Sequence, residues 1–259
     1  MADPVLLERR GDIAVIVLNR ADKLNALNKA MWIGVRDLVR ACSTDDALRC
    51  VVLRGAGEKA FSPGADIAEF PTERANARQA ASYGQLMHET MGAIADCRHP
   101  TVAMIHGLCV GGGLELAIMC DLRICGESSR FGVPINRIGV TMAYPEIGAL
   151  IALVGRAAAL EILFEGRVFD AAEAKDKGLV TRVVPDAQVT DAALAAARRI
   201  ADGAPLVNRW HKQFARRLED SRPLDAAERA EPYETFDTED YRAGFQAFLD
   251  KQKVAFKGR

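Results

Sequence analysis

The chain of 259 residues is 49% hydrophobic and carries a formal net charge of −1 at pH 7. Its length suffices for one large domain with its own core, or for one domain and a small appendage. The balanced charge gives no electrostatic reason to expect nucleic acid or a membrane surface as a partner, and the six cysteines and four histidines show neither a CxxC pair nor a metal-ligand spacing.

The N-terminus and the apolar runs of the sequence favour a cytoplasmic protein. The first segment, MADPVLLERRGD, lacks the apolar region of a signal peptide. The most apolar later stretch, residues 147–164, is interrupted by Gly155, Arg156 and Glu161, so we do not expect it to cross a membrane. Several cysteines stand in apolar runs, where a free thiol packs as a small core residue, and a reducing compartment fits them best.

In chain order, the first half of the sequence alternates strand and helix patterns. Strands are predicted where apolar residues alternate or run together, and helices where they recur every three to four residues behind a capping residue such as Asn28. The predicted strands are 5–9, 12–19, 50–54 and 101–106, and the predicted helices are 28–42, a short one from 65, 72–97 and one from about 112.

The second half changes character after residue 186. Before it we expect strands over 122–125 and 181–184 and helices over 147–154, 156–164 and 171–177, the last ending at Gly178. After it no strand-like run occurs, and three helical segments follow, over 186–203, 206–220 and 223–253. The pattern predicts an α/β fold with short parallel strands and a helical C-terminal region.

The stretch TVAMIHGLCVGGGLELAIMCDLR, residues 101–123, carries the first candidate for chemistry. A strand is followed by Gly107, by glycines at 111–113 and by an apolar helix with one charge, Glu115. Glycines leave backbone amides uncovered, and the first amides of a helix lack intrahelical partners and lie at its positive end. Such a corner can hold an oxygen that becomes negative during a reaction. Because Glu115 has apolar neighbours on every side, we expect it to be buried with a shifted pKa.

A purely structural alternative exists for this stretch, in which Glu115 complements the helix dipole and the glycines allow close packing. A second corner weighs against it. The segment AFSPGADI, residues 60–67, again places a glycine between a strand and a short helix, which leaves the amide of Ala65 free. Free amides from two such corners can converge on one oxygen and form an oxyanion hole.

Together these stretches resemble the enoyl-CoA hydratase/isomerase family, also called the crotonase family. The resemblance covers nearly the whole chain and rests on KAFSPGADIAEF and HGLCVGGGLELAIMCDLRIC in this order, on Asn19-Arg20 before Asn25-Ala26-Leu27, on Arg130-Phe131-Gly132 before Pro134, on the helices around Gly155 and on AAEAKDKGLVTRVV. It implies a crotonase-like (ClpP/crotonase) spiral of ββα units over residues 1–200. It also implies a helical C-terminal region over 201–259 that helps to build a homotrimer or a hexamer, a dimer of trimers.

The same resemblance implies an acyl-coenzyme A thioester as the substrate, without a further cofactor or a metal. The amides of Ala65 and Gly112 would hold the thioester oxygen and stabilise an enolate, and Glu115 matches the first of two catalytic glutamates. The residues expected along the coenzyme A path are Lys23, Leu24, Ala26, Ala65, Asp66 and Ile67. Four residues near the C-terminus either approach the coenzyme A phosphates of a subunit or form a solvated basic tail: Phe248, Lys251, Phe256 and Lys257.

The sequence departs from the family at two places. Where the hydratases carry a second glutamate after Phe-Gly-x-Pro, this chain has Ile135, which can neither transfer a proton nor hold a water. The glycine-rich loop that follows in the family is replaced by TMAYPE, residues 141–146. Other branches of the family place an acid or base on this loop, so Glu146 is the candidate replacement; alternatively it is a surface glutamate in the first turn of the next helix. Tyr144 either positions a water or packs.

The other polar residues are expected to be structural. Asp66 caps the short helix after Ala65, His106 has no second ligand, and His88 and His99 belong to no constellation. The leading hypothesis is an acyl-CoA enzyme that works through a thioester enolate, either as an atypical hydratase or as an isomerase or lyase with a single base. The alternatives are a non-catalytic acyl-CoA binding protein and, weakened by the lack of any dinucleotide-binding or P-loop motif, a nucleotide-binding protein.

Overall fold

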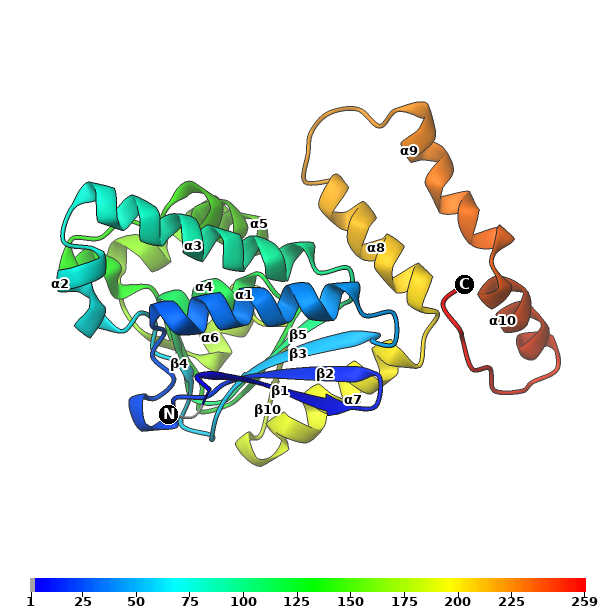
Figure 1. Cartoon of the computed structure of the whole chain (residues 1–259), viewed down its shortest axis with the longest axis horizontal. Coiled ribbons are helices and arrows are strands. Elements are labelled where there is room, and N and C mark those ends of the chain that lie inside the picture. The colour runs from blue at the N-terminus through cyan, green and yellow to red at the C-terminus, as the bar shows by residue number, and fades with distance from the viewer. Residues whose placement is uncertain (1–2) are drawn as a thin grey trace.

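The computed structural model describes residues 3–259 and builds them around two sheets (Figure 1). The larger sheet has six strands in the order β1-β2-β3-β5-β7-β10. Strands β1 and β2 pair antiparallel and the other neighbours run parallel. The strands are β1 Val5–Arg10, β2 Ile13–Leu18, β3 Cys50–Gly55, β5 Thr101–Ile105, β7 Leu122–Gly126 and β10 Arg182–Val184.

The smaller sheet has four strands in the order β4-β6-β8-β9. They are β4 Ala60–Ser62, β6 Leu108–Val110, β8 Arg130–Gly132 and β9 Phe169–Asp170, and only the last pair is antiparallel among these strands. This sheet was not predicted as a unit from the sequence, because strands of two or three residues are too short to show alternation.

Helices cover both faces of the larger sheet. The helices of the described residues are α1 Lys29–Thr44, α2 Phe70–Glu73, α3 Ala77–Asp96, α4 Gly112–Ile118, α5 Tyr144–Glu165, α6 Ala171–Asp176, α7 Val189–Ala201, α8 Pro205–Arg217, α9 Ala226–Ala230 and α10 Glu239–Leu249. Short 3-10 turns lie at Ala21–Lys23, Ile67–Glu69, Pro134–Ile138, Asp186–Gln188 and Glu231–Asp237. Figure 1 shows α1 and α3 on one side of the sheet and α7 on the other, while α8 to α10 extend away from it.

Strand β2 shows why a central strand of the larger sheet has a continuous apolar sequence. Alternate residues of a strand point to opposite faces. Ala14, Ile16 and Leu18 belong to the core shared with α1, whereas the residues between them belong to the core shared with α7. Both faces are therefore buried, as expected for parallel strands between layers of helices.

Two helices that were predicted to be continuous are interrupted, because a capping residue inside each segment begins a new helix. The predicted helix 72–97 is split into α2 and α3, where Asn76 caps α3 by accepting a hydrogen bond from the amide of Gln79 (3.1 Å). The predicted helix 223–253 is split into α9, a 3-10 turn and α10, where Thr238 caps α10 through the amide of Tyr241 (3.0 Å).

Helix α5 is long and apolar enough, by length and composition alone, to cross a membrane. Its backbone is broken at Gly155 (φ 75°, ψ 162°), where the sequence predicted two helices. Each half is about half of the roughly 20 residues that a membrane span requires. All six cysteines are free and buried.

The start of α4 lies so close to β4 that only glycine fits at position 113. A Cβ on Gly113 would overlap the carbonyl oxygen of Ser62 and lie 2.8 Å from its Cβ. We expect Gly113→Ala to lower the free energy of unfolding by about 3 kcal/mol, as overpacking does, when measured by urea denaturation.

The matched control for this change is Gly148→Ala on an exposed part of α5, where a Cβ would meet nothing within 4 Å. This variant should be more stable than the wild type by up to about 1 kcal/mol, because alanine favours helix. Equal stability of the two variants would contradict the close approach of α4 and β4.

Candidate functional site

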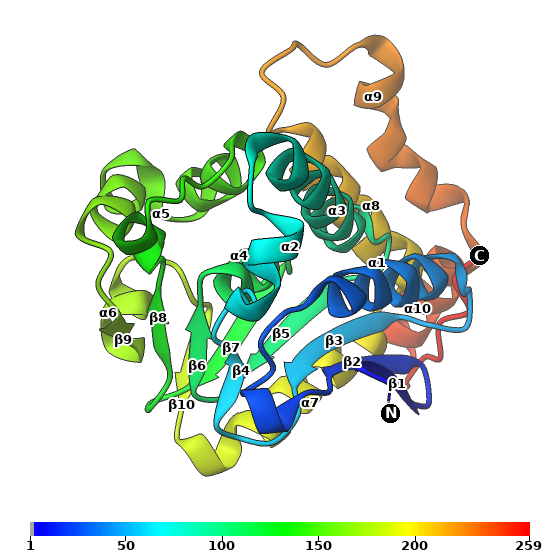
Figure 2. The ribbon, with the colours of Figure 1, turned by 60° about the vertical axis from the view of Figure 1, so that its left-hand side comes forward.

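A cavity of about 670 Å³ lies beside the start of α4. Its lining residues come from four segments, within 63–74, 80–88, 110–115 and 134–146. Figure 2 shows α2, α3, α4 and α5 around this region. Both glycine corners and the loop of residues 141–146, which departs from the family pattern, therefore line the same cavity.

The two glycine corners meet at the wall of this cavity. Gly64 has a positive φ of 105°, and a Cβ there would lie 3.2 Å from the amide nitrogen of Gly112. A larger residue at position 64 would therefore strain the turn and crowd that amide. The corner after β4 and the corner before α4 are in direct contact.

The amides of Ala65 and Gly112 are left out of the bonds that fix these corners. The amides of Leu27 and Asp66 donate to the carbonyls of Gly64 and Leu27, both at 2.8 Å, and pass over Ala65 between them. Gly112 is the first residue of α4. The first intrahelical hydrogen bond runs from the amide of Glu115 to the carbonyl of Gly111 (2.9 Å), so the amide of Gly112 precedes it and takes no part in the helix ladder. Ala65 and Gly112 both line the cavity.

Glu115 is buried one turn into α4, with only 6% of its surface exposed. It lines the cavity, and its Oε2 has no hydrogen-bond partner among the described residues. Burial, and then the charge of Glu146, raise the pKa of Glu115 to about 7, although Arg74 acts in the opposite direction. The expectation of a buried carboxylate with a shifted pKa is confirmed.

Glu146 also lines the cavity, so the alternative of a surface glutamate is wrong. It lies in the first turn of α5 and is 3% exposed, whereas Tyr144 is 93% exposed. Residues two apart on a helix point to nearly opposite sides, and here Tyr144 takes the solvent side. Tyr144 does not belong to the cavity lining.

His88 was expected to belong to no constellation, and this prediction is wrong. It lies on α3, lines the cavity and places its Nε2 3.1 Å from Oε1 of Glu146. The other carboxylate oxygen of Glu146 has no partner among the described residues. The spacing of four residues between Gly84 and His88 could have predicted that both lie on the same side of α3. Nothing in the sequence predicts Glu146 as the partner of His88.

The loop with the predicted coenzyme A residues Lys23, Leu24 and Ala26 is tied to the first corner by two residues that the sequence analysis assigned no role. Arg20 donates to the carbonyl of Ala26 (2.7 Å) and to the carboxylate of Asp66 (2.9 Å). Buried Asn25 donates to the carbonyls of Ala56 (3.1 Å) and Ala60 (2.8 Å).

The smaller predictions around this corner have mixed outcomes. Asp66 caps the 3-10 turn after Ala65 by accepting from the amide of Ala68 (3.2 Å), as predicted. Ile67 and Ile135 line the cavity, whereas Lys23, Leu24 and Ala26 do not. Their contact with coenzyme A stays a prediction.

The C-terminal candidates lie away from the cavity of their own chain. Phe248 is 82% exposed on α10, and Figure 1 places α10 at the opposite end of the molecule from α2. The tail folds back on this helix, since buried Asp240 accepts from the amides of Lys257 (2.7 Å) and Gly258 (2.8 Å). A role of Phe248 and Lys251 in binding coenzyme A in a neighbouring subunit stays a prediction.

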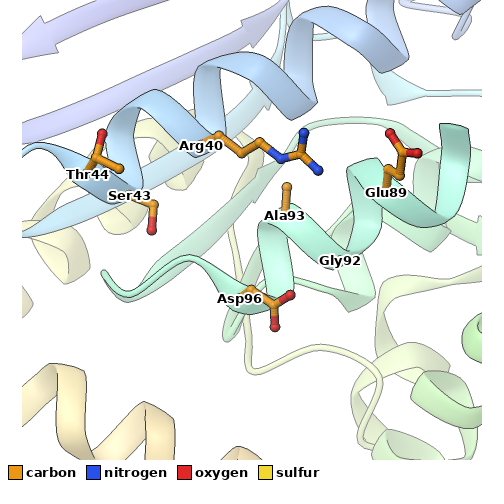
Figure 3. Close-up of a pocket in the computed structure, with 7 residues that line it drawn as sticks. All are labelled: Arg40, Ser43, Thr44, Glu89, Gly92, Ala93 and Asp96. Atoms are coloured by element: carbon orange, nitrogen blue, oxygen red, sulfur yellow. The ribbon is translucent and has the colours of Figure 1, made fainter.

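A second hollow of about 370 Å³ lies between α1 and α3 and lacks comparable chemistry (Figure 3). Figure 3 shows Arg40 reaching from α1 toward the α3 residues Glu89 and Ala93, with Asp96 further along. Neither carboxylate there is buried. Among residues 3–259 no group of three or more His, Cys, Asp or Glu could hold a metal ion.

The raised pKa of Glu115 leads us to expect that the free energy of unfolding depends on pH. Folding raises this pKa from an ordinary 4.5 to about 7, so the proton on Glu115 stabilises the folded state. That contribution is complete below pH 4.5 and is lost as the pH rises through 7. Glu115→Gln cannot ionise and should be more stable than the wild type at pH 8 by up to about 3 kcal/mol, and equally stable at pH 4.

Urea denaturation across this pH range measures the effect, and Glu127→Gln, at an exposed position, serves as the control. The control should follow the wild type at every pH. A stability difference for Glu115→Gln that does not change with pH would show that Glu115 is not the group whose proton is retained.

Comparisons with known proteins identify the family of this chain. The family model described as enoyl-CoA hydratase/isomerase matches residues 8–259. The chain is 33% identical to a short-chain-enoyl-CoA hydratase of Clostridium acetobutylicum over 98% of both chains, and 32% identical to a crotonyl-CoA hydratase of Syntrophomonas wolfei over 97% of both. A crystal structure of an enoyl-CoA hydratase/carnithine racemase from Magnetospirillum magneticum is 50% identical, with a TM-score of 0.98 over 100% of this chain and 97% of that one. The expected crotonase-like fold is confirmed, and the chain belongs to the enoyl-CoA hydratase/isomerase family.

Proposed function

We propose that this enzyme is an enoyl-CoA hydratase in which Glu146 replaces the second glutamate that is missing at position 135. One observation carries the proposal: Glu146 is a buried carboxylate in the lining of the same cavity as Glu115, and its charge raises the pKa of Glu115. The relatives named as hydratases of short-chain enoyl-CoA and crotonyl-CoA support the reaction class.

Hydration of a conjugated thioester needs two proton transfers. As the water oxygen bonds to Cβ, a carboxylate accepts its proton, and the double-bond electrons move through Cα to the thioester oxygen. The amides of Ala65 and Gly112 stabilise the resulting enolate. A protonated carboxyl group then gives its proton to Cα, so that water has been added and both carboxyl groups together hold the same number of protons as before.

These reaction steps require one ionised and one protonated carboxyl group. Two coupled carboxyls share a proton over the pH range between their two apparent pKa values. With the pKa of Glu115 raised to about 7, the pair retains one proton close to neutral pH. His88, at 3.1 Å from Oε1 of Glu146, orients that carboxylate. Ile135, in the cavity lining, leaves the proton transfers to residues 115 and 146.

Coenzyme A itself would lie along the loop of Lys23, Leu24 and Ala26 and the corner of Ala65 to Ile67. The helical region over 201–259 would build a trimer or a dimer of trimers, where the Phe248 and Lys251 region could reach the coenzyme A of a neighbour. The oligomeric state is open to measurement by light scattering. The reaction proposed here needs neither a metal nor a further cofactor.

The first test of the reaction is hydration of a short 2-enoyl-CoA, followed as loss of the absorbance of the conjugated thioester. We expect Glu115→Gln and Glu146→Gln each to lower kcat by roughly 10²- to 10⁴-fold, the usual contribution of a positioned acid or base. Glu127→Gln, at an exposed position, should keep full activity.

Full activity of Glu146→Gln would exclude Glu146 from the proton transfers. A wild type that leaves 2-enoyl-CoA unchanged but converts a 3-enoyl-CoA to the conjugated isomer would favour the single-base isomerase. Coenzyme A thioester binding without turnover of either substrate would favour a non-catalytic binding protein.

A second test concerns His88 as a positioning residue. Removing its ring should cost about 10- to 100-fold in kcat, the equivalent of one hydrogen bond to a charged group, with little change in KM. His88→Gln, whose amide can still donate to the carboxylate, should recover a large part of the kcat lost in His88→Ala. Equal losses in both variants would mean that His88 only packs.

A further inference from the structure

Arg74 is a half-buried arginine in the cavity lining that lacks a carboxylate partner among the described residues. It lies between α2 and α3, and its guanidinium carbon is 4.1 Å from the centre of the Tyr83 ring and 4.9 Å from that of Phe70. The side-chain hydrogen bond found for it goes to the sulfur of Met87. A thioether is a weak acceptor and carries no charge to balance the arginine.

The carboxylates nearest to Arg74 in the sequence are engaged elsewhere. Glu69 accepts hydrogen bonds from the amide of Lys29 (2.9 Å) and the hydroxyl of Tyr83 (3.2 Å). Glu73 pairs with the ammonium group of Lys29 (2.8 Å). The guanidinium is therefore held by two aromatic rings but is not neutralised by a direct partner.

A guanidinium held in this way is suited to bind an anion. Its planar fork of donors matches a carboxylate in a bidentate arrangement, and fixing the fork in advance lowers the entropy lost on binding. Arg74 is also the only lysine or arginine among the described lining residues. The wall near it is otherwise mostly apolar, with Phe70, Ala80, Ala81 and Met87.

We infer that the acyl group of the natural substrate carries a free carboxylate at its far end, which Arg74 binds, so that the substrate class is the coenzyme A monothioester of an unsaturated dicarboxylic acid. The inference rests on the proposed function, because it names the acyl group of that same site. With the thioester oxygen at Ala65 and Gly112, the acyl chain extends into the remainder of the cavity, which Arg74 lines.

A structural alternative is that Arg74 serves as the counter-charge of Glu115. This alternative does not explain why the guanidinium lacks a direct carboxylate partner. Arg74 does lower the pKa of Glu115, yet burial and Glu146 still raise it to about 7. The arginine therefore does not bring this pKa back to its ordinary value, and no direct ion pair joins the two among the described residues. A free anion-binding group remains.

The test is a binding measurement that needs no turnover. Calorimetry compares saturated thioesters in matched pairs with four to six acyl carbons, such as glutaryl-CoA against valeryl-CoA and adipyl-CoA against hexanoyl-CoA, with free coenzyme A as a third ligand. At the best chain length we expect the wild type to bind the carboxylate-bearing member at least 10-fold more tightly, as one charge-assisted pair allows.

Two variants assign the effect to Arg74. Arg74→Gln should abolish the preference while changing the Kd of the neutral thioesters and of free coenzyme A less than about twofold. Arg78→Gln, an exposed arginine outside the cavity lining, should keep the preference. A wild type that favours the neutral member at every length would overturn the inference. So would an equal weakening of every ligand by Arg74→Gln, because Arg74 would then contact a coenzyme A phosphate or serve only the fold.

Turnover separates this inference from the proposed function. If the binding preference is found but no unsaturated thioester is hydrated, the hydratase proposal fails and the assignment of Arg74 stands. If a neutral 2-enoyl-CoA is hydrated efficiently and no carboxylate preference is found, the hydratase stands and the assignment of Arg74 fails.

Discussion

The contact between two strand-to-helix corners is the constraint on which the rest of the site depends. Gly64 and Gly113 permit it, since a Cβ at either position would meet backbone atoms of the opposite corner or strand. The contact brings the amides of Ala65 and Gly112 to one cavity wall and sets Glu115 one turn behind them. A rigid core below, built by parallel strands with helices on both faces, holds the two corners in place.

Two carboxyl groups lie in the wall of this cavity with little exposure to solvent. Glu115 and Glu146 are both almost fully buried, and each has an oxygen without a hydrogen-bond partner among the described residues. Burial, and then the charge of Glu146, raise the pKa of Glu115 to about 7. Glu146 lies in the first turn of α5, whereas position 135 carries an isoleucine. In the proposed mechanism a different element therefore supplies the second carboxylate.

Much of the fold and part of the site could be predicted from the sequence. The strands of the larger sheet, the buried Glu115 and the cap at Asp66 followed from local patterns. The smaller sheet did not, because its strands are too short to show a period. The inward direction of Glu146 and its contact with His88 did not either, since the two lie on separate helices and their approach is set by tertiary packing. Arg74 was missed because its surroundings on Tyr83 and Phe70 arise only when α2 and α3 come together.

The most direct test of this account is a crystal structure with the hydration product, a 3-hydroxyacyl-CoA, bound in the cavity. We expect the thioester oxygen within hydrogen-bond distance of the amides of Ala65 and Gly112, and the 3-hydroxyl group between the carboxyl groups of Glu115 and Glu146. A product whose hydroxyl group is out of reach of Glu146, or whose thioester oxygen lies away from the two amides, would contradict it.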